Sequence, residues 1–418
     1  MFKVSKLKAL QEQCLADKTS FKAALKAAFT PGDKTQEADK ADLFNISFQD
    51  VAEQFLGRNE YKDVVTGTRW EQVGALQQVQ ETGGGVVLGS AFQNISGFTD
   101  VVAGLVDAMI LQSYLEQPRI AKELAGTKQV KVNGGKRIKA TGDGKSGKGL
   151  AWGEPLPNVG LSEMWVNLPV QVRYGNRVEV DQSVFIFDFT GQVQEYAVEA
   201  GTQVAFDVET DGAKVIMGIT NPYKANDTTG NTFLTTNGAG IMAYTNAKAA
   251  TQLLDYTSMN TIQQILEGNT DPFTSRPISV RSPTVLAMPQ NYLYARSIIR
   301  AIEIQQQKGT TVSTDFPNRI MRSENPLADG GYSLVQAPRN WYNLLNTSLS
   351  SATNAQGRWY LGDFKRAFEW LYTIPFSTKG VPLSSEDISK GTVLIQQCEE
   401  AGVMAVIEPR YVGYGSVE

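Results

Sequence analysis

The sequence predicts an α+β fold, in which helices and strands occupy separate stretches of the chain. Residues 190–217 carry apolar side chains at helical spacing. An extended stretch rich in lysine and glycine precedes them, and residues 358–408 read as a series of short strands. With 418 residues the chain can form two or three structural units and bury a sizeable core.

Composition excludes several classes of function. The net charge is −4, so no overall positive field favours nucleic acid. The chain contains no histidine, which removes every histidine-based general base, catalytic triad and metal site. The two cysteines, Cys14 and Cys398, lie at opposite ends of the chain and form no metal-binding or redox motif. We therefore expect no catalytic residue, no cofactor and no metal.

Two further observations concern the cell membrane. No apolar segment follows the N-terminal residues, so we expect no secretory signal. The most apolar run, 101–111, is too short to span a bilayer and is interrupted by Asp107. We expect a protein that is made in the cytoplasm and has no membrane contact.

The N-terminal part reads as an arm. Apolar residues recur at roughly helical spacing in 1–30, where six lysines stand against two acids. We favour a surface helix with a solvated basic face, and the other interpretation is an arm that contacts a partner or a polyanion. A second helical patch covers 48–56, and apolar residues from 95 to 114 predict a buried helix, or a strand and a helix, that ends at Pro118.

Residues 128–148 form a lysine-rich ribbon with seven basic side chains and one acid, Asp143. Alternation at 129–132 and 137–140 predicts a long two-stranded excursion with glycine at its tip. Since an isolated hairpin is marginal in water, we expect the ribbon to lie on another subunit. The run 144–146 resembles the end of a phosphate-binding loop, but lysine occupies the position of the required glycine, so we reject a nucleotide site.

The long helix has a candidate capping residue at each end. Thr190 is a candidate N-cap and Gly218 a candidate C-terminal stop. At ~1.5 Å per residue the helix spans roughly 40 Å. Acidic residues fill one face, and the opposite face carries the predicted buried stripe, which consists of Val193, Tyr196, Ala197, Ala200, Val204, Val208 and Val215.

A compact unit follows after loops at 219–245. It consists of a helix that closes at Gly268, a buried strand at 284–288 and a helix from 291 to 304. We expect loops again at 307–340. The predicted C-terminal strands cover 358–364, 368–372, 392–396 and 403–408, with a turn at 399–402.

Several stretches resemble one viral family. Residues 152–157, Trp-Gly-Glu-Pro-Leu-Pro, resemble the returning strand of its E-loop hairpin, and 178–188 resemble the segment that introduces its spine helix. Residues 361–364 and 402–409 resemble its closing strands. In their order and spacing, residues 70–418 resemble the major capsid protein of tailed bacteriophages, which has the Hong Kong 97-type fold.

The resemblance implies a division into regions. These are an N-terminal arm (1–72), the first part of a peripheral domain (73–117), the E-loop (118–168), a peripheral part with the spine helix (169–217), an axial domain (218–354) and closing strands (355–418).

The resemblance also implies a structural, non-catalytic protein of the virion. Pentamers and hexamers of it would form an icosahedral shell around a double-stranded DNA genome, with weak non-specific DNA contact and with scaffolding, portal and decoration proteins as partners. The E-loop residues expected to contact a neighbouring subunit are Lys136, Lys139, Lys145, Lys148, Trp152 and Glu154.

Two processing steps known in the family are weighed against these residues. Some members join an E-loop lysine to an asparagine, and Lys145 and Lys148 could be so placed, but no partner asparagine or glutamate is identified, so cross-linking is not predicted. Some relatives lose an N-terminal scaffolding region of a hundred residues or so; because this arm is shorter, we expect no cleavage.

Three alternatives stay open. The first is an encapsulin-like compartment, which has the same fold but encloses cargo enzymes. The second is an enzyme that uses Asp207, Glu209 and Asp211, although we expect a solvated helix face here rather than a paired acid and base. The third is a nucleic-acid binder centred on 128–148, where the absence of aromatic residues leaves only phosphate contacts.

Overall fold

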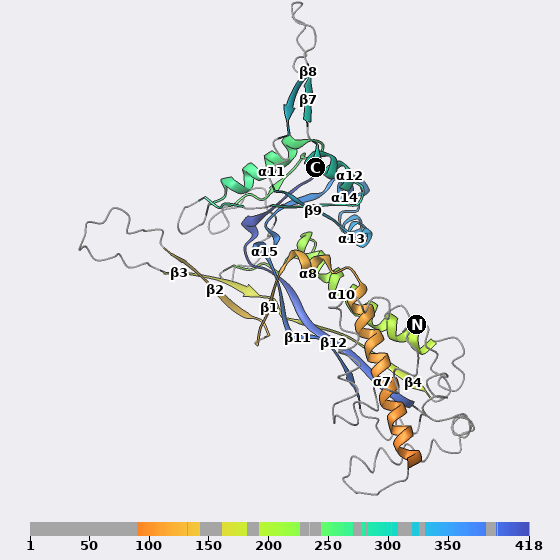
Figure 1. Cartoon of the computed structure of the whole chain (residues 1–418). Helices are drawn as coiled ribbons and strands as arrows, with labels where there is room; N and C mark the ends of the chain where they lie inside the picture. Colours follow the sequence, from red (N-terminus) through yellow and green to blue (C-terminus); the bar gives the residue numbers. More distant parts are fainter. Residues whose placement is uncertain are drawn as a thin grey trace, which may run out of the picture. The chain divides into compact units, whose positions relative to one another are not determined.

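The α+β class is confirmed by a computed structural model of the protein (Figure 1). The structure describes residues 90–131, 133–142, 161–181, 192–225, 234, 244–270, 277–280, 283–301, 303–307, 320–325, 331–381, 390 and 392–417. The chain divides into two compact units: unit 1 comprises 1–118, 173–208 and 374–401, and unit 2 comprises 119–172, 209–373 and 402–418. The helices expected within 1–56 lie outside the described residues.

Unit 1 contains two packed helices. Helix α7 (Ser90–Glu116) confirms the predicted buried helix, and α10 (Gln192–Ile216), whose residues after Val208 belong to unit 2, is the predicted long helix. The helices approach closely at Gly201, where an added Cβ would lie 2.2 Å from Ser113 Oγ and 2.4 Å from the Ile110 carbonyl oxygen. Glycine permits this approach because it has no side chain.

Helix α10 ends as the sequence predicts. Gly218 has φ 75°, its N–H donates to the Val215 carbonyl at 3.1 Å, and the Ile219 N–H donates to the Lys214 carbonyl at 2.9 Å. This is the Schellman arrangement, which satisfies the last carbonyls of a helix. The predicted N-cap, Thr190, lies outside the described residues.

The buried stripe predicted for α10 is correct except at one position. Val193, Ala197 and Val204 are buried, whereas Tyr196 is 60 % exposed, so its assignment to the stripe is wrong. Tyr196 lies about 100° around the helix from Ala197, which places it with the polar residues of the outer face.

The unit 1 sheet is built from β4 (Val172–Asp181), the end of β11 (Phe368–Gly380) and the first part of β12 (Thr392–Val406), with β12 between the other two. The Tyr114 ring of α7 stacks on Phe376 at 3.7 Å, and the Tyr114 hydroxyl donates to Glu400 at 2.6 Å. Glu399 accepts hydrogen bonds from Arg173 and Lys379. Helix α7 is therefore joined to the strands by both apolar and polar contacts.

Unit 2 contains a five-stranded sheet in the order β5-β13-β10-β6-β9. β10 pairs antiparallel with β6 and β13, whereas β9 runs parallel to β6 and β5 parallel to β13. The strands are β5 (Ala247–Lys248), β6 (Thr284–Ala287), β9 (Ser333–Gln336), β10 (Trp359–Gly362) and β13 (Val412–Gly415).

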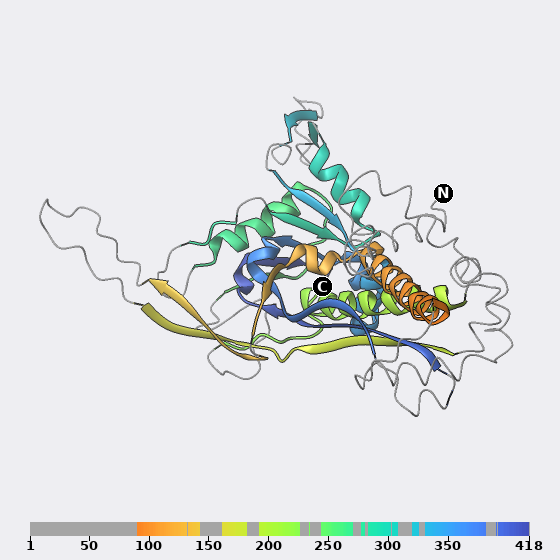
Figure 2. The ribbon, with the colours of Figure 1, turned by 60° about the horizontal axis from the view of Figure 1, so that its bottom comes forward.

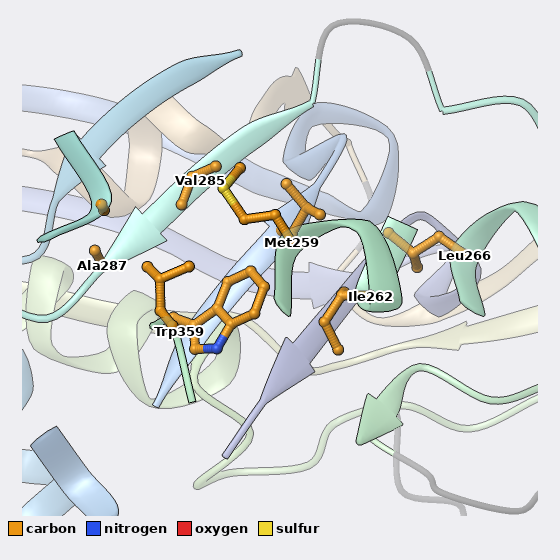
Figure 3. Packing of buried hydrophobic residues seen from close by; sticks show 9 residues of the cluster. Met259, Ile262, Leu266, Val285, Ala287 and Trp359 are labelled. Atoms are coloured by element: carbon orange, nitrogen blue, oxygen red, sulfur yellow. The ribbon is translucent and has the colours of Figure 1, made fainter. Parts of the chain in front are cut away.

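Helix α11 (Tyr256–Gly268) covers this sheet. Its N-cap Asp255 accepts hydrogen bonds from the Thr257 and Ser258 N–H groups at 3.0 and 3.1 Å. The helix contributes the predicted apolar residues to a core that Figure 3 shows around the Trp359 indole. The labelled members of this core are Met259, Ile262, Leu266, Val285, Ala287 and Trp359.

The helix predicted from 291 to 304 is shorter in the structure. Helix α12 (Tyr292–Arg300) is followed by β7 (Glu303–Gln307), which pairs antiparallel with β8 (Ile320–Glu324). The prediction of loops over 307–340 is therefore wrong, since β8 and β9 fall within it. The helices that were not predicted include α13 (Arg339–Leu349) and α14 (Ala352–Gly357).

The predicted turn at 399–402 is also wrong, because β12 runs without interruption through these residues. The remaining elements of unit 2 are α8 (Ile120–Leu124), β1 (Gly126–Gln129), β2 (Gly135–Gly142), β3 (Leu161–Leu168), α15 (Phe364–Ala367) and the 3-10 helix η3 (Pro409–Tyr411). Within the described part of the chain, no helix is both long and apolar enough to cross a bilayer.

Candidate subunit-contact surface

The lysine-rich ribbon forms a hairpin with a different partner from the one predicted. β2 pairs antiparallel with β3 in a register that runs from Gly135 opposite Leu168 to Gly142 opposite Leu161. Residues 126–129 instead form β1, which pairs parallel with β11. The expected pairing of 129–132 with 137–140 is therefore wrong, although the two-stranded excursion itself is present. Figure 2 shows β2 and β3 side by side.

The base of the hairpin is held on unit 2 by polar contacts. Arg137 on β2 forms an ion pair with Glu369 on β11. On the other strand, the Asn167 N–H donates to the Lys224 carbonyl at 2.8 Å. Because both strands are anchored, the direction in which the hairpin leaves the unit is fixed at its base.

Apolar packing strengthens the same base. Leu168 of β3 and Val130 after β1 pack against a small core of Leu371, Ala405 and Ile407. Because both side chains are only partly buried, each contributes less than the ~1.5–3 kcal/mol of full burial. The hairpin is a two-stranded sheet of its own, and its base packs on residues of β11 and of the end of β12.

Of the six predicted contact residues, the structure describes the surroundings of one. Lys136 is exposed, and its ammonium nitrogen lies 4.8 Å from the centroid of the Trp165 ring on the paired strand. Lys139 belongs to β2 opposite Met164, but its side chain lies outside the described part. The other four, Lys145, Lys148, Trp152 and Glu154, also lie outside the described residues.

The reading from sequence missed the residues that anchor the hairpin. Arg137 and Glu369 are 232 positions apart, so no local pattern connects them. Trp165 beside Lys136 was also not singled out. An alternating cation and aromatic on two adjacent strands is the signal that could have found this second pair.

The carboxylates proposed for an alternative enzyme do not share a face. Asp207 is exposed on α10, whereas Glu209 is buried at 6 % exposure. Asp211 forms an ion pair with Lys214 at 2.9 Å. The grouping of these three acids into one solvated face is therefore wrong.

Within unit 2, Glu209 joins the last part of α10 to α8 and α13. Its two carboxylate oxygens accept hydrogen bonds from the Ala121 N–H of α8 at 3.1 and 3.0 Å, and one accepts from Trp341 Nε1 of α13 at 3.1 Å. Burial raises the pKa of Glu209 to about 7, and the nearby Glu123 adds to this, while the hydrogen bonds and Lys122 oppose it. Its role is structural, because it satisfies buried donors.

A cavity of about 440 Å³ lies in unit 2 and is lined by residues of α8, β6, β9 and α15. Its acidic residues are Glu123 and Asp363, and Asp363 already caps α15 by accepting the Arg366 N–H at 3.3 Å. In the part of the chain that is described, no group of three or more histidine, cysteine, aspartate or glutamate residues could hold a metal ion.

Comparison with known proteins identifies a protein family whose profile matches this chain. A profile described as phage capsid protein matches residues 168–412, more than half of the chain. No protein in the curated set matches. The match includes α10, β12 and four strands of the five-stranded sheet, β5, β6, β9 and β10, and it agrees with the resemblance seen in the sequence.

Similar solved structures include a virus-like particle from Pyrococcus furiosus, at 8 % identity and TM-score 0.38, which covers 74 % of this chain and 97 % of that chain. The capsid of a native GTA particle matches at 12 % identity and TM-score 0.40, with coverages of 72 % and 91 %. The capsid of cyanophage P-SCSP1u matches at 13 % identity and TM-score 0.39, with coverages of 70 % and 86 %. At these scores the family profile alone carries the assignment.

The profile favours a phage shell over an encapsulin-like compartment, and a capsid protein is a structural component of the virion. The chain belongs to the phage capsid protein family.

Proposed function

We propose that the protein is a major capsid protein that assembles through pentamers and hexamers into an icosahedral shell around a double-stranded DNA genome. The observation that carries this proposal is the family match over residues 168–412. Such a protein works through its surfaces, since each subunit of a closed shell must match its neighbours.

The E-loop, 118–168, supplies one of these surfaces by lying over a neighbouring subunit. The anchored base of the β2–β3 hairpin supports this role, because a fixed direction of exit reduces the entropy lost on association. Its proposed contact residues are Lys136, Lys139, Lys145, Lys148, Trp152 and Glu154. The other predicted regions, from the arm at 1–72 to the closing strands at 355–418, belong to the same proposal.

The proposed partners follow from the same role. They are further copies of the chain, scaffolding, portal and decoration proteins, and packaged DNA. With a net charge of −4, DNA contact is weak and non-specific, since phosphate binding depends on clustered cations. Assembly takes place in the host cytoplasm, and the protein has no catalytic activity.

Negative-stain microscopy of the purified recombinant chain tests the proposal. We expect closed hollow particles, or rings of five and six subunits, at high protein concentration. A chain that stays a compact monomer under those conditions would refute it. Incubation with chromogenic esters and glycosides should give no turnover, and a signal that follows the purified chain would support the enzyme alternative.

A further inference from the structure

The first four turns of α10 present one exposed face. Its members recur at steps of three and four residues, so they fall within about a third of the helix circumference. Two large aromatic side chains are among them, with Tyr196 60 % and Phe206 47 % exposed. We name this surface the acidic-aromatic face, and it consists of Glu195, Tyr196, Glu199, Gln203, Phe206 and Asp207.

The chemistry of this face is unusual for a helix that only meets solvent. Three of its six residues are carboxylates, and none is a cation. Gln203 donates a hydrogen bond to Asp207 at 2.9 Å, which links two polar residues of the face. Exposed aromatic residues are enriched at protein contacts, and carboxylates around them favour a partner of opposite charge. The complementary partner must supply both lysine or arginine side chains and apolar ones.

We propose that residues 1–30 of the chain dock on the acidic-aromatic face as a basic amphipathic helix. This segment carries six lysines and two acids, so its charge is opposite to that of the face. Its apolar residues recur at helical spacing and offer partners for Tyr196 and Phe206. They are Phe2, Val4, Leu7, Leu10, Leu15, Phe21, Leu25 and Phe29.

The lengths agree. The face extends from Glu195 to Asp207, or roughly 20 Å at ~1.5 Å per residue. A docking helix of about 13–15 residues covers this distance. Residues 1–30 contain two stretches of that length, and 89 residues precede the first described helix, α7.

The lysine-rich ribbon at 128–148 is the competing basic segment. It carries more cations than the N-terminal segment, but it contains no aromatic residue. One of its few large apolar residues, Val130, already packs against Leu371, Ala405 and Ile407. The ribbon therefore supplies charge without the apolar partners that Tyr196 and Phe206 require.

Photo-cross-linking on the full-length chain tests the docking. The probe is p-benzoylphenylalanine, placed at position 196 or 206, where it replaces one aromatic ring with another. After irradiation and digestion, mass spectrometry should find the cross-linked peptides within 1–30. A probe at Glu179, which is exposed on β4 of the same unit, should not give these peptides. This readout does not require particles, so it can fail or succeed independently of shell assembly.

Reversing the charges on both proposed partners tests whether their electrostatic attraction holds the segment on the face. Lys18→Glu with Lys22→Glu and Lys26→Glu should lower the cross-linking yield from position 196 roughly tenfold, equal to about 1.4 kcal/mol. Adding Glu195→Lys, Glu199→Lys and Asp207→Lys should restore it.

As a control, reversal of Lys139, Lys145 and Lys148 should leave the yield unchanged. Three outcomes would overturn the proposal: cross-links that map to 128–148, cross-links that map to α10 of a second copy, or a yield that does not respond to the three N-terminal reversals.

Discussion

Glu209 shows how one buried carboxylate joins separate segments of unit 2. Its oxygens accept hydrogen bonds from the Ala121 N–H and the Trp341 indole N–H, and both of these residues are fully buried. A carboxylate in such a position is costly when charged, which is why its pKa is raised to about 7.

The free energy of unfolding should therefore decrease as the pH rises from 4.5 to 7. The unfolded chain releases the Glu209 proton near pH 4.5, whereas the folded chain holds it up to about pH 7. Below this window both states are protonated and the contribution is complete; above it, roughly 2–3 kcal/mol is lost. Urea unfolding of the subunit at pH 5 and pH 8 measures the difference.

Glu209→Gln should remove most of this pH dependence while keeping an oxygen acceptor for Ala121 and Trp341. Asp211→Asn, on the same helix but half-exposed beside Lys214, is the matched control and should keep the wild-type slope. An equal slope in the wild type and in Glu209→Gln would show that the Glu209 carboxyl is not the responsible group.

At the level of elements, the contact between α7 and α10 depends on Gly201. Alanine normally stabilises a helix relative to glycine by ~1 kcal/mol. At position 201 we expect the opposite sign, because the added methyl group would overlap Ser113 Oγ and the Ile110 carbonyl. Gly201→Ala should lower stability by ~1–3 kcal/mol in urea unfolding.

Gly268→Ala is the control for this prediction. Gly268 is also helical, at the end of α11, and an added Cβ there would meet nothing within 4 Å. This variant should be neutral or more stable by up to ~1 kcal/mol. If the two variants change stability equally, helix propensity rather than the close approach would explain the result.

The hairpin base gives a second prediction about an element. Arg137 and Glu369 are the charged pair that joins β2 to β11, and they are one-third exposed and mostly buried, respectively. A double-mutant cycle with alanine at each position should give a coupling of ~0.5–1 kcal/mol, since exposure to solvent weakens such pairs. Hydrogen exchange of the β2 amides should be faster in Arg137→Ala.

The matched control is Arg177→Ala, which removes an exposed ion pair with Glu179 on β4. It should leave the exchange of the β2 amides unchanged. Exchange of β2 that is insensitive to Arg137 would mean that the apolar contacts of Leu168 and Val130 alone hold the hairpin.

For the whole molecule, the ribbon lysines should control assembly more than folding. Lys145→Glu with Lys148→Glu should lower the yield of particles roughly tenfold, because the hairpin would carry the wrong charge for its neighbour. Lys248→Glu with Lys365→Glu makes the same charge change at exposed positions outside the hairpin and should have little effect. Sedimentation gives the yields. Equal losses in both variants would point to net charge rather than to the hairpin.

Sequence reasoning succeeded where the signal is local. The long helix and its end at Gly218 follow from spacing and from one residue with a positive φ, and the core residues Met259, Ile262 and Leu266 follow from the same helical period. It failed at Tyr196, because the sequence does not show which arc of a helix another element covers.

The uninterrupted course of β12 was missed for a related reason. The sequence of Glu399, Glu400 and Gly402 is typical of a turn, but in the structure residues distant in sequence contact each of these positions within the strand. Arg173 and Lys379 bind Glu399, and the Tyr114 hydroxyl binds Glu400. At Gly402 an added Cβ would lie 2.6 Å from the Trp370 ring, so the glycine makes room for a tryptophan rather than for a bend.

The candidate site was anticipated only in outline. The lysine-rich ribbon was identified from its charge, but its partner strand and its anchor at Glu369 depend on contacts across more than two hundred positions. The resemblance to the capsid family was seen in the order and spacing of stretches along the chain, whereas membership of the family rests on the profile match.

The buried thiol of Cys398 can report when β12 separates locally from β4 and α10. Its sulfur faces the Asn176 and Ala200 carbonyls at 3.5 and 3.9 Å, the residue is fully buried, and burial raises the pKa of the thiol. Iodoacetamide should modify it only when β12 separates from β4 and α10. The rate of Cys398 alkylation, followed by peptide mass spectrometry in free subunits and in assembled particles, would thus show how much assembly slows this opening.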